Sequence, residues 1–394
     1  MKIINVLHHS ISPFAGMFPE GDALHYNSGI PMDYARAIQK RYKNIELEVW
    51  RPECTCQKVT LWRDNNGITH RIFPSKYIRF GFEISREMLN AISKLQHSSD
   101  VFVWMHGLYN LHATLLAPVL HKIPSIVQSH GGLPAPAMSS MSKNHSNRIA
   151  YWGWYLPECY ALPKYFRVHA ISSMEMAALK HYYPASKITL RPAGTDFSVF
   201  SQIRRADARN LLKIPRNEPL VFFAGRLIEG KGIEALVQAL GLLRDKLPNA
   251  RLYIAGDGPA RASVNHLIES LRLDGNVVLL GHVAHTDLPA WYCAADVTAM
   301  PSRHEWFGRV AVESMACGTP VVTTNAGGAI DIVKTFKCGV LVQPDDISQL
   351  AAGLSSILQK QVNVSPDIES GRASYDWDSI LASSFASLGH LERL

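Results

Sequence analysis

The sequence lacks most of the features that would place it in a special class of protein. It contains no low-complexity tract and no internal repeat, which excludes disordered chains and solenoids. Its first residues, MKIINVLHHSISPF, have only a short apolar run and no small-residue cleavage site. We therefore expect no secretory signal and a cytoplasmic location.

A long apolar run suited to a membrane is also missing. The nearest candidate, residues 101–120, carries His106, Asn110 and His112 and contains a proline near its end. This pattern indicates a buried strand, a loop and a helix rather than a membrane span.

Cysteine is scarce, with 6 residues in a chain of 394. Only Cys54 and Cys56 lie close together, and a Cys-x-Cys pair without partner ligands is poor evidence for a metal site. Reduced thiols of a cytoplasmic protein explain the pair more simply. We expect no bound metal ion.

What the chain does contain is ordinary for a globular protein, with 47% apolar and 19% charged residues. Its length exceeds the size at which one hydrophobic core usually stops growing, which predicts two domains. The net charge of +7 is unevenly distributed. Residues 1–200 hold 21 Lys and Arg against 13 Asp and Glu, a balance of +8, whereas residues 201–394 hold 19 against 20, a balance of −1.

Strand patterns alternate with helix patterns along the whole chain. Apolar runs such as DVFVWMHG, IPSIVQSHGG and RVHAISS suit parallel strands buried on both faces, and IELEVW alternates like a half-buried strand. In the second half, residues 233–243 show helical spacing of apolar side chains, and Asp346 with Gln349 predicts a capping box. We predict an α/β fold with two Rossmann-like doubly wound domains facing a cleft, over residues 1–200 and 201–375.

The string Gly225-x4-Gly230-Lys231 is nearly the phosphate-binding loop of nucleoside triphosphatases. The next residue is Gly232, however, and glycine has no hydroxyl to bind Mg²⁺, so an ATPase is disfavoured. Two interpretations remain. Arg226 and Lys231 are either solvated cations after a strand, or they clamp a diphosphate between that strand and the next helix.

A second stretch, residues 301–322, favours the clamp. After the strand DVTAM, a loop carries Glu305, and a helix begins near Phe307 and Gly308. The amino terminus of that helix offers N–H groups and a partial positive charge to a phosphate. Glu305 and Glu313 would be about 12 Å apart along a helix, too far to share a proton but suited to two hydroxyl-bearing parts of one ligand. The alternative is a pair of solvated glutamates.

Several stretches together resemble one known family. They are PSRHEWFGRVAVESMACGTPVVTTNAGG, FFAGRLIEGKGI, IAGDGP and ITLRPAGTDFSVF, and they are similar to the retaining GT-B glycosyltransferases of glycosyltransferase family 4. The resemblance covers the C-terminal half densely. It extends to YDWDSILASSF, which looks like the family's terminal helix crossing back to the first domain, here residues 376–394.

The resemblance implies a nucleotide-sugar donor, with a UDP-sugar favoured over a GDP-sugar. On this chain, Arg226 and Lys231 would neutralise the donor diphosphate. Glu313 would bind the ribose hydroxyls, and Glu305 would bind the transferred sugar near the reacting carbon. The implied backbone contacts are Val283 for the base, and Phe307 and Gly308 for the sugar or phosphate.

In the N-terminal half the resemblance implies two further donor contacts. NSGIP offers Gly29 where the family usually has paired glycines, and His130 in QSHGG matches a histidine that faces the donor sugar. The alternative for His130 is a structural histidine at a strand end. Two residues depart from the family's pattern, Trp306 and Arg309, and both bear on sugar identity. Arg309 is either a cation for an acidic sugar or acceptor phosphate, or a helix-surface residue.

The family further implies a front-face displacement with retention of configuration and without a metal ion. His130, Glu305, Arg226 and Lys231 are the expected catalytic groups. The acceptor would be a hydroxyl of a glycan or of a lipid-linked sugar, and no nucleic acid is expected as a partner. Two alternatives stay open at this point. One is a nucleotide-sugar epimerase or hydrolase on the same fold, and the other is a non-catalytic two-domain sugar-binding protein.

The basic first half predicts an anionic acceptor or surface. Residues 141–166 mix cations with amphipathic aromatic residues, a combination that membrane interfaces favour. We expect peripheral contact with the inner face of the membrane, although these aromatics could instead pack in the core. The residues concerned are Lys143, Arg148, Lys164, Tyr151, Trp152, Trp154 and Tyr155.

Overall fold

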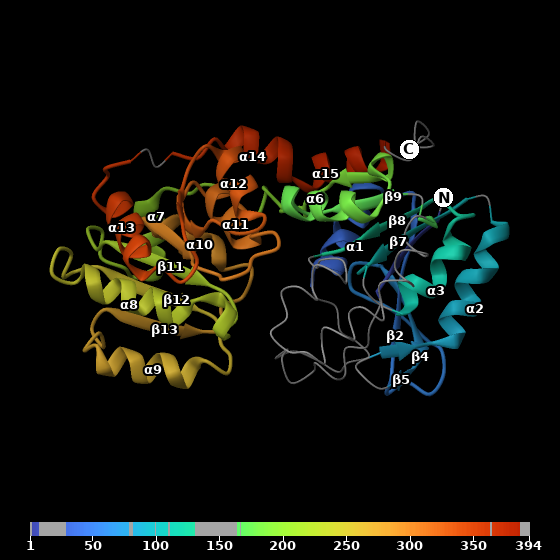
Figure 1. Ribbon diagram of the computed structural model, residues 1–394, viewed down its shortest axis with the longest axis horizontal. Coiled ribbons are helices and arrows are strands. Elements are labelled where there is room, and N and C mark those ends of the chain that lie inside the picture. Colours follow the sequence, from blue (N-terminus) through green and yellow to red (C-terminus); the bar gives the residue numbers. More distant parts are fainter. Residues whose placement is uncertain are drawn as a thin grey trace. The chain divides into compact units, whose positions relative to one another are not determined.

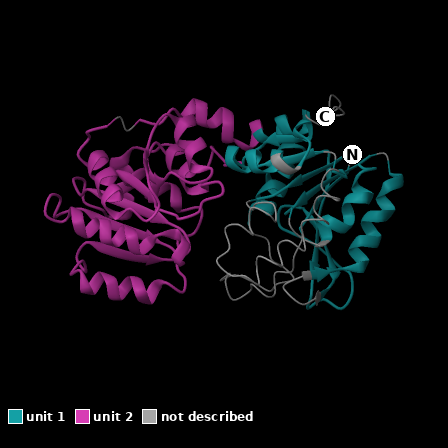
Figure 2. Ribbon diagram, in the orientation of Figure 1, with its two compact units in different colours: residues 1–193, 380–394 teal, residues 194–379 magenta. Residues whose placement is uncertain are grey.

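The computed structural model in Figure 1 describes residues 2–7, 29–78, 82–98, 100–108, 111–130, 164–165, 167–362 and 365–386. The chain forms two compact units, which are coloured separately in Figure 2. The first unit comprises residues 1–193 and 380–394, and the second comprises residues 194–379. Each unit has its own sheet and its own helices, as the alternating strand and helix patterns predict.

The first unit is built on an eight-stranded sheet with the order β10-β9-β8-β7-β1-β2-β4-β3. Neighbouring strands are parallel except for β3, which runs antiparallel to β4 at the edge. A small antiparallel pair, β5 and β6, stands apart from this sheet. The strands are β1 Lys2–Val6, β2 Glu46–Glu53, β3 Thr60–Arg63, β4 Thr69–Pro74, β5 Lys76–Ile78, β6 Phe82–Ile84, β7 Val101–His106, β8 Ser125–Gln128, β9 Arg167–Ala170 and β10 Ile188–Leu190.

Helices cover both faces of the first sheet. Alternate strand residues such as Val103 and Val127 form one apolar core with α2 and α3. The other face carries Trp104, against which Tyr34 of α1 and Phe385 of α15 pack, with ring centroids 4.9 and 6.1 Å away. The helices are α1 Ile30–Arg41, α2 Arg86–Lys94, α3 Leu111–Leu120, α6 Ser173–Tyr182 and the short 3₁₀ turns η4 Leu95–His97 and η6 Ala185–Lys187. The last helix, α15 Trp377–Ala386, begins in the second unit and belongs to the first from residue 380 onward.

The second unit is built on a six-stranded, fully parallel sheet with the order β13-β12-β11-β14-β15-β16. The strands are β11 Leu220–Ala224, β12 Arg251–Ala255, β13 Val277–Gly281, β14 Val297–Met300, β15 Val321–Thr324 and β16 Val340–Val342. The helices are α7 Arg205–Leu212, η7 Glu229–Lys231, α8 Ile233–Leu243, α9 Arg261–Ser270, α10 Leu288–Ala294, α11 Arg309–Ala316, α12 Ala329–Phe336, α13 Ile347–Leu358 and α14 Ile368–Tyr375.

The apolar spacing predicted for residues 233–243 is confirmed by α8. Ile233, Leu236, Leu240 and Leu243 are all buried in one core with α9 and α13. At the start of α13, the Asp346 carboxylate accepts the Gln349 amide at 2.8 Å, as a capping box requires. The Gln349 side chain accepts from Gln343 instead of Asp346, so only half of the predicted box forms.

The prediction for IELEVW is wrong in one respect. Only Glu46 of β2 is exposed, and the seven residues after it are buried. The reason is that β2 pairs with β1 on one side and β4 on the other, under helices, instead of facing water on one face. In the described parts of the chain, every helix is too short or too polar to cross a membrane.

The strand order of each sheet contains one topological switch point. In the second sheet the chain passes from β11 to β12 in one direction and from β14 to β15 in the other, so the switch lies between β11 and β14. In the first sheet it lies between β1 and β7 by the same reasoning. Open parallel sheets bind ligands outside the carboxyl ends of their strands at such points.

Candidate functional site

The switch point of the second sheet holds an ion pair between two predicted site residues. Lys231 follows β11 and Glu305 follows β14, and the Lys231 Nζ lies 2.8 Å from the Glu305 Oε2. The two side chains are 30% and 15% exposed. A cation and a carboxylate from different loops thus meet at the carboxyl edge of adjacent strands.

The loop that carries Lys231 leaves no room for a side chain at Gly232. This glycine has φ 68° and caps the amino end of α8. A Cβ there would lie 2.1 Å from the Pro301 carbonyl oxygen, so neither Ser nor Thr fits. The two loops approach too closely for the Ser or Thr whose hydroxyl binds Mg²⁺ in an ATPase. The structure therefore gives a steric reason, in addition to the sequence, against an ATPase.

Glu305 is positioned mainly through its backbone. The Gly328 N–H donates to the Glu305 carbonyl at 3.2 Å, and a Cβ on Gly327 would collide with the same oxygen. The Ser302 hydroxyl donates to Glu305 Oε2 at 3.3 Å. The loop after β15 thus presses directly on the loop after β14. The paired glycines in NAGG are the sequence signal for this contact, although the sequence does not reveal which loop they approach.

Helix α11 begins at Arg309, after the loop that carries Glu305, so its amino terminus follows the carboxyl end of β14. Its N-cap is Gly308, and no side chain caps the helix, so its first amide groups remain directed toward the loop. Phe307 is buried and its ring lies 5.9 Å from the ring of Tyr375. The Phe307 side chain therefore anchors the turn, while its backbone and that of Gly308 lie at the helix terminus.

Glu313 lies one turn into α11 and is only 3% exposed. Three side chains contact its carboxylate. Oε1 accepts from Arg309 Nε at 2.9 Å and lies 3.2 Å from His285 Nε2, whereas Oε2 accepts from the Tyr292 hydroxyl at 2.9 Å. Glu305 shares none of these contacts, so the two carboxylates occupy separate environments.

Electrostatics keep Glu313 ionised in this buried position. Burial by itself raises the pKa of Glu313, but the hydrogen bond from His285 and the charge of Arg309 outweigh it and hold the pKa below its ordinary value. Burial, reinforced by the Glu313 charge, raises the pKa of Tyr292, which therefore remains protonated and donates its hydroxyl. His285 and Tyr292 were not identified from the sequence, because they reach Glu313 from the loop and helix after β13.

The remaining predicted residues of this unit flank the same edge. Arg226 is exposed in the segment between β11 and α8 that also carries Lys231. Val283 is half-buried in the loop that follows β13. Because β13, β11 and β14 are parallel, all three segments leave the sheet at its carboxyl edge.

The switch point of the first sheet holds a chain of hydrogen bonds that ends at His130. Asn5 of β1 and His106 of β7 are bonded through Oδ1 and Nε2, and His106 Nδ1 lies 2.5 Å from His130 Nε2. The two imidazoles are stacked, with ring centroids 4.7 Å apart. Gly29 caps α1 beside them, since the Asn5 amide donates to the Pro31 carbonyl at 2.8 Å.

These contacts assign the proton on one nitrogen of His106. Asn5 Nδ2 donates to Pro31, so Asn5 Oδ1 is the acceptor and His106 Nε2 must carry a proton. Its other nitrogen, Nδ1, shares a hydrogen bond with His130 Nε2. His130 also has φ 56°, a region that residues other than glycine rarely enter. A polar Asn5 inside an apolar strand is the sequence signal for this network, and it was missed.

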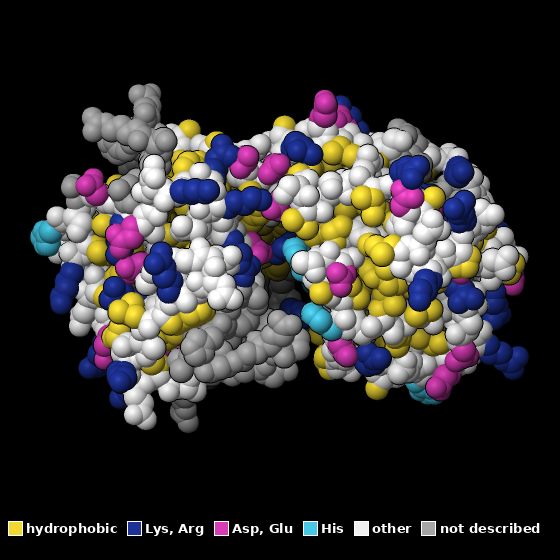
Figure 3. Space-filling model, turned by 180° about the vertical axis from the view of Figure 1, so that it is seen from behind, with side chains coloured by type: hydrophobic (Ala, Val, Ile, Leu, Met, Phe, Trp, Pro, Cys, Tyr) yellow, Lys and Arg dark blue, Asp and Glu magenta, His cyan; other side chains and the backbone are white. Residues whose placement is uncertain are grey.

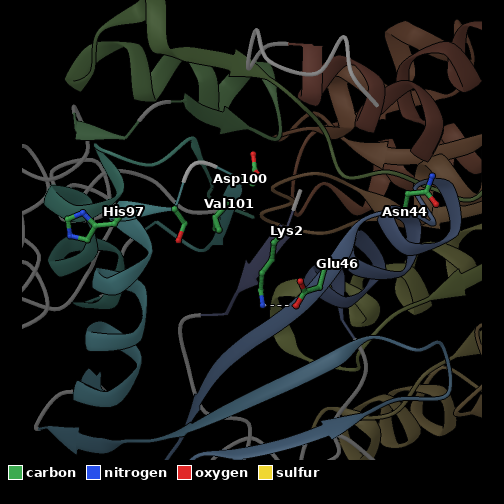
Figure 4. Close-up of a pocket in the computed structure, with 7 residues that line it drawn as sticks. Lys2, Asn44, Glu46, His97, Asp100 and Val101 are labelled. Carbon is green, nitrogen blue, oxygen red and sulfur yellow. Dashed lines mark hydrogen bonds and ion pairs between the residues drawn. The ribbon is translucent and has the colours of Figure 1, made fainter.

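A pocket of about 510 Å³ lies elsewhere in the first unit and is shown in Figure 4. Lys2 and Val101 are the first residues of β1 and β7, so the pocket lies at the amino edge of the sheet, opposite the switch point. Lys2 is also paired with Glu46 at 2.8 Å. We therefore do not assign this pocket to the candidate functional site. Its lining residues are Lys2, Asn44, Glu46, His97, Ser98, Asp100 and Val101.

The surface seen in Figure 3 shows Lys and Arg side chains scattered among acidic and hydrophobic ones, with no single basic patch on this face. The aromatic and basic segment predicted to contact a membrane lies outside the described residues, apart from Lys164 and Tyr165. Among the described residues, no group of three or more His, Cys, Asp or Glu is placed to hold a metal ion.

Comparison with known proteins gives a match to one family over part of the chain and a likeness to known folds over nearly all of it. Residues 204–370 match the family model described as glycosyl transferases group 1. The D-inositol 3-phosphate glycosyltransferase of Pseudarthrobacter chlorophenolicus is 37% identical over 182 residues, which cover 45% of this chain and 43% of that protein. The match thus spans less than half the length of this curated relative.

Solved structures resemble the chain over almost its whole length. The sucrose-phosphate synthase of Thermosynechococcus elongatus gives a TM-score of 0.73 at 21% identity, covering 99% of both chains. The Anabaena protein HepE in complex with UDP-glucose gives a TM-score of 0.70 at 20% identity, covering 99% of this chain and 100% of that one. At such identities the likeness concerns the fold.

Proposed function

We propose that the chain, which matches the glycosyl transferases group 1 family over residues 204–370 and has the GT-B fold, transfers a sugar from a nucleotide-sugar donor to an acceptor hydroxyl. The observation that carries the proposal is the 2.8 Å contact between Lys231 and Glu305 at the switch point of the second sheet. It brings together the residue that we assign to the phosphate and the residue that we assign to the sugar.

The donor diphosphate would lie between the first turn of α11 and the cations of the β11 loop. Arg226 and Lys231 supply positive charge, and the backbone of Phe307 and Gly308 supplies the helix terminus. Two side-chain cations and a helix terminus can take the place of Mg²⁺ in neutralising a diphosphate. Glu305, 15% exposed, is the carboxylate available to the transferred sugar.

The nucleoside would lie farther along the same edge. Glu313 is ionised and therefore suited to accept hydroxyl protons of a ribose. The base would lie near the backbone of Val283. We favour a UDP-sugar, because a similar solved structure, HepE, holds UDP-glucose.

We infer a front-face displacement with retention of the anomeric configuration. The bond between the anomeric carbon and the phosphate oxygen breaks first, and its electron pair leaves with the diphosphate toward Lys231, Arg226 and α11. The acceptor oxygen then bonds to the same face of the sugar, and its proton passes to the departing phosphate oxygen. Preorganised positive charge near the leaving group would supply most of the stabilisation.

The first unit would contribute the sugar contact and the acceptor. His130 would contact the transferred sugar, and Gly29 would allow close approach beside it. We propose that the acceptor is a glycan or lipid-linked hydroxyl. Sedimentation with anionic liposomes at low and high salt tests the lipid-linked form, which requires salt-sensitive binding. Binding that is absent at low salt would leave a glycan acceptor.

Nucleotide titration tests the assignment of the donor site. We expect one of UDP, GDP or ADP to bind to the intact chain, and Arg226→Ala and Lys231→Ala each to weaken it about tenfold or more, as loss of a charge-assisted contact should. Unchanged affinity in both variants would show that the diphosphate binds elsewhere. No binding of any of the three would refute a nucleotide-sugar donor.

A further inference from the structure

Two of the three side chains that contact the Glu313 carboxylate, Arg309 and His285, lie between it and solvent. Tyr292 is fully buried behind Oε2. Arg309 and His285, on Oε1, have side chains 30% and 53% exposed, while that of Glu313 is only 4% exposed. A ribose that approaches from solvent therefore meets Arg309 and His285 before it meets Glu313.

Arg309 contacts both the Glu313 carboxylate and His285. Its Nε donates to Glu313 Oε1 at 2.9 Å, and its Nη2 lies 3.1 Å from His285 Nε2. The same His285 nitrogen also lies 3.2 Å from Glu313 Oε1. Arg309 thus contacts both Glu313 and His285, and the ring of Phe200, 5.0 Å from that of His285, packs edge-on against the histidine.

The lone pairs of Glu313 are nearly used up by this arrangement. A carboxylate offers about four acceptor positions, and its three neighbours already occupy most of them. Two ribose hydroxyls cannot both be accommodated unless one neighbour leaves. Arg309 is the neighbour whose departure an anionic ligand would compensate, because it is the first residue of α11, at the end assigned to the diphosphate.

We propose that Arg309 is a third cation of the donor site, which covers Glu313 in this structure and turns to the donor diphosphate when the ribose takes its place on the carboxylate. This inference rests on the proposed function and adds a coupling to it. Ribose and diphosphate would be recognised together, since the ribose displaces the side chain that the diphosphate then binds. The Arg309 side chain is 30% exposed and can turn toward the donor, while the ribose hydroxyls replace it as donors to the buried Glu313 carboxylate.

The coupling predicts effects of opposite sign for two ligands. In Arg309→Met the competitor for Glu313 is lost, so uridine, which has no phosphate, should bind at least about threefold more tightly. UDP should bind about tenfold more weakly, because a charge-assisted contact to the diphosphate is lost. Arg309→Lys keeps a cation without the planar fork, and should retain most of the UDP affinity. NMR titration reaches the millimolar range needed for uridine.

Arg204→Met is the matched control. Arg204 pairs with Asp207 within one helix turn, and its side chain is 84% exposed. It should leave both affinities unchanged. Equal weakening of uridine and UDP in Arg309→Met would indicate a structural role and overturn the proposal, as would uridine bound no better than by the intact chain. If the intact chain binds no nucleoside diphosphate, the proposed function fails first, and this inference fails with it.

Discussion

Removing the Lys231 side chain should lower kcat/KM strongly and change the free energy of unfolding little. The Lys231 Nζ lies 2.8 Å from Glu305 Oε2, but both side chains are partly exposed. Pairs of this kind contribute about 0–1 kcal/mol to folding, so Lys231→Ala should change the free energy of unfolding by no more than about 1 kcal/mol. Loss of one cation that faces developing charge costs about 2–4 kcal/mol in the transition state. At about 1.36 kcal/mol per tenfold, kcat/KM should fall about 30- to 1,000-fold.

The assay pairs donor kinetics with urea unfolding of the same variants. Lys337→Ala is the matched control, because Lys337 forms an ion pair of similar length, 2.9 Å to Asp367, on the surface of the same unit. That control should leave kcat/KM within about twofold. A fall in kcat/KM of less than about threefold in Lys231→Ala, or a loss of stability that accounts for the fall, would refute the reasoning.

Three further predictions concern the two glutamates, the need for a metal ion and a buried histidine. Glu313→Gln should chiefly weaken nucleotide binding, whereas Glu305→Gln should chiefly lower kcat; effects on KM alone in both would contradict these assignments. Dialysis against EDTA should leave activity unchanged, and a strict requirement for Mg²⁺ would contradict the metal-free mechanism. His169 is fully buried, neither ring nitrogen has a hydrogen-bond partner among the described residues, and burial lowers its pKa to about 3. As pH falls, His169 is therefore protonated in the unfolded state before it is protonated in the folded state. The free energy of unfolding should decrease as pH falls from about 6.5 toward 3. Urea unfolding at several pH values should show a smaller decrease in His169→Phe.

Local patterns predicted the second unit well because its strands and helices follow simple periodicities. The buried face of α8 could be predicted from the spacing of apolar residues alone. The site residues Lys231 and Glu305 follow strands, and parallel strands bring their carboxyl ends to one edge, so their proximity follows from the fold class.

The partners of those residues could not be predicted, because they come from distant segments. Tyr292 reaches Glu313 from a helix 21 residues earlier in the chain, and His106 reaches Asn5 across 101 residues. Nothing in local spacing selects such partners. A polar residue within an apolar strand, as at Asn5, is the kind of signal that marks a buried network without naming its other members.

The central claim is that the chain transfers a sugar from a nucleotide donor, and proton NMR of the reaction tests it most directly. UDP-sugars and GDP-sugars would be incubated in turn with the chain and with glycan and lipid-linked acceptors, and Lys231→Ala would serve as the inactive comparison. We expect that one donor loses its sugar only when an acceptor is present, and that the new anomeric signal has the configuration of the donor. Conversion of the donor without an acceptor, an inverted product, or binding without any turnover would contradict it.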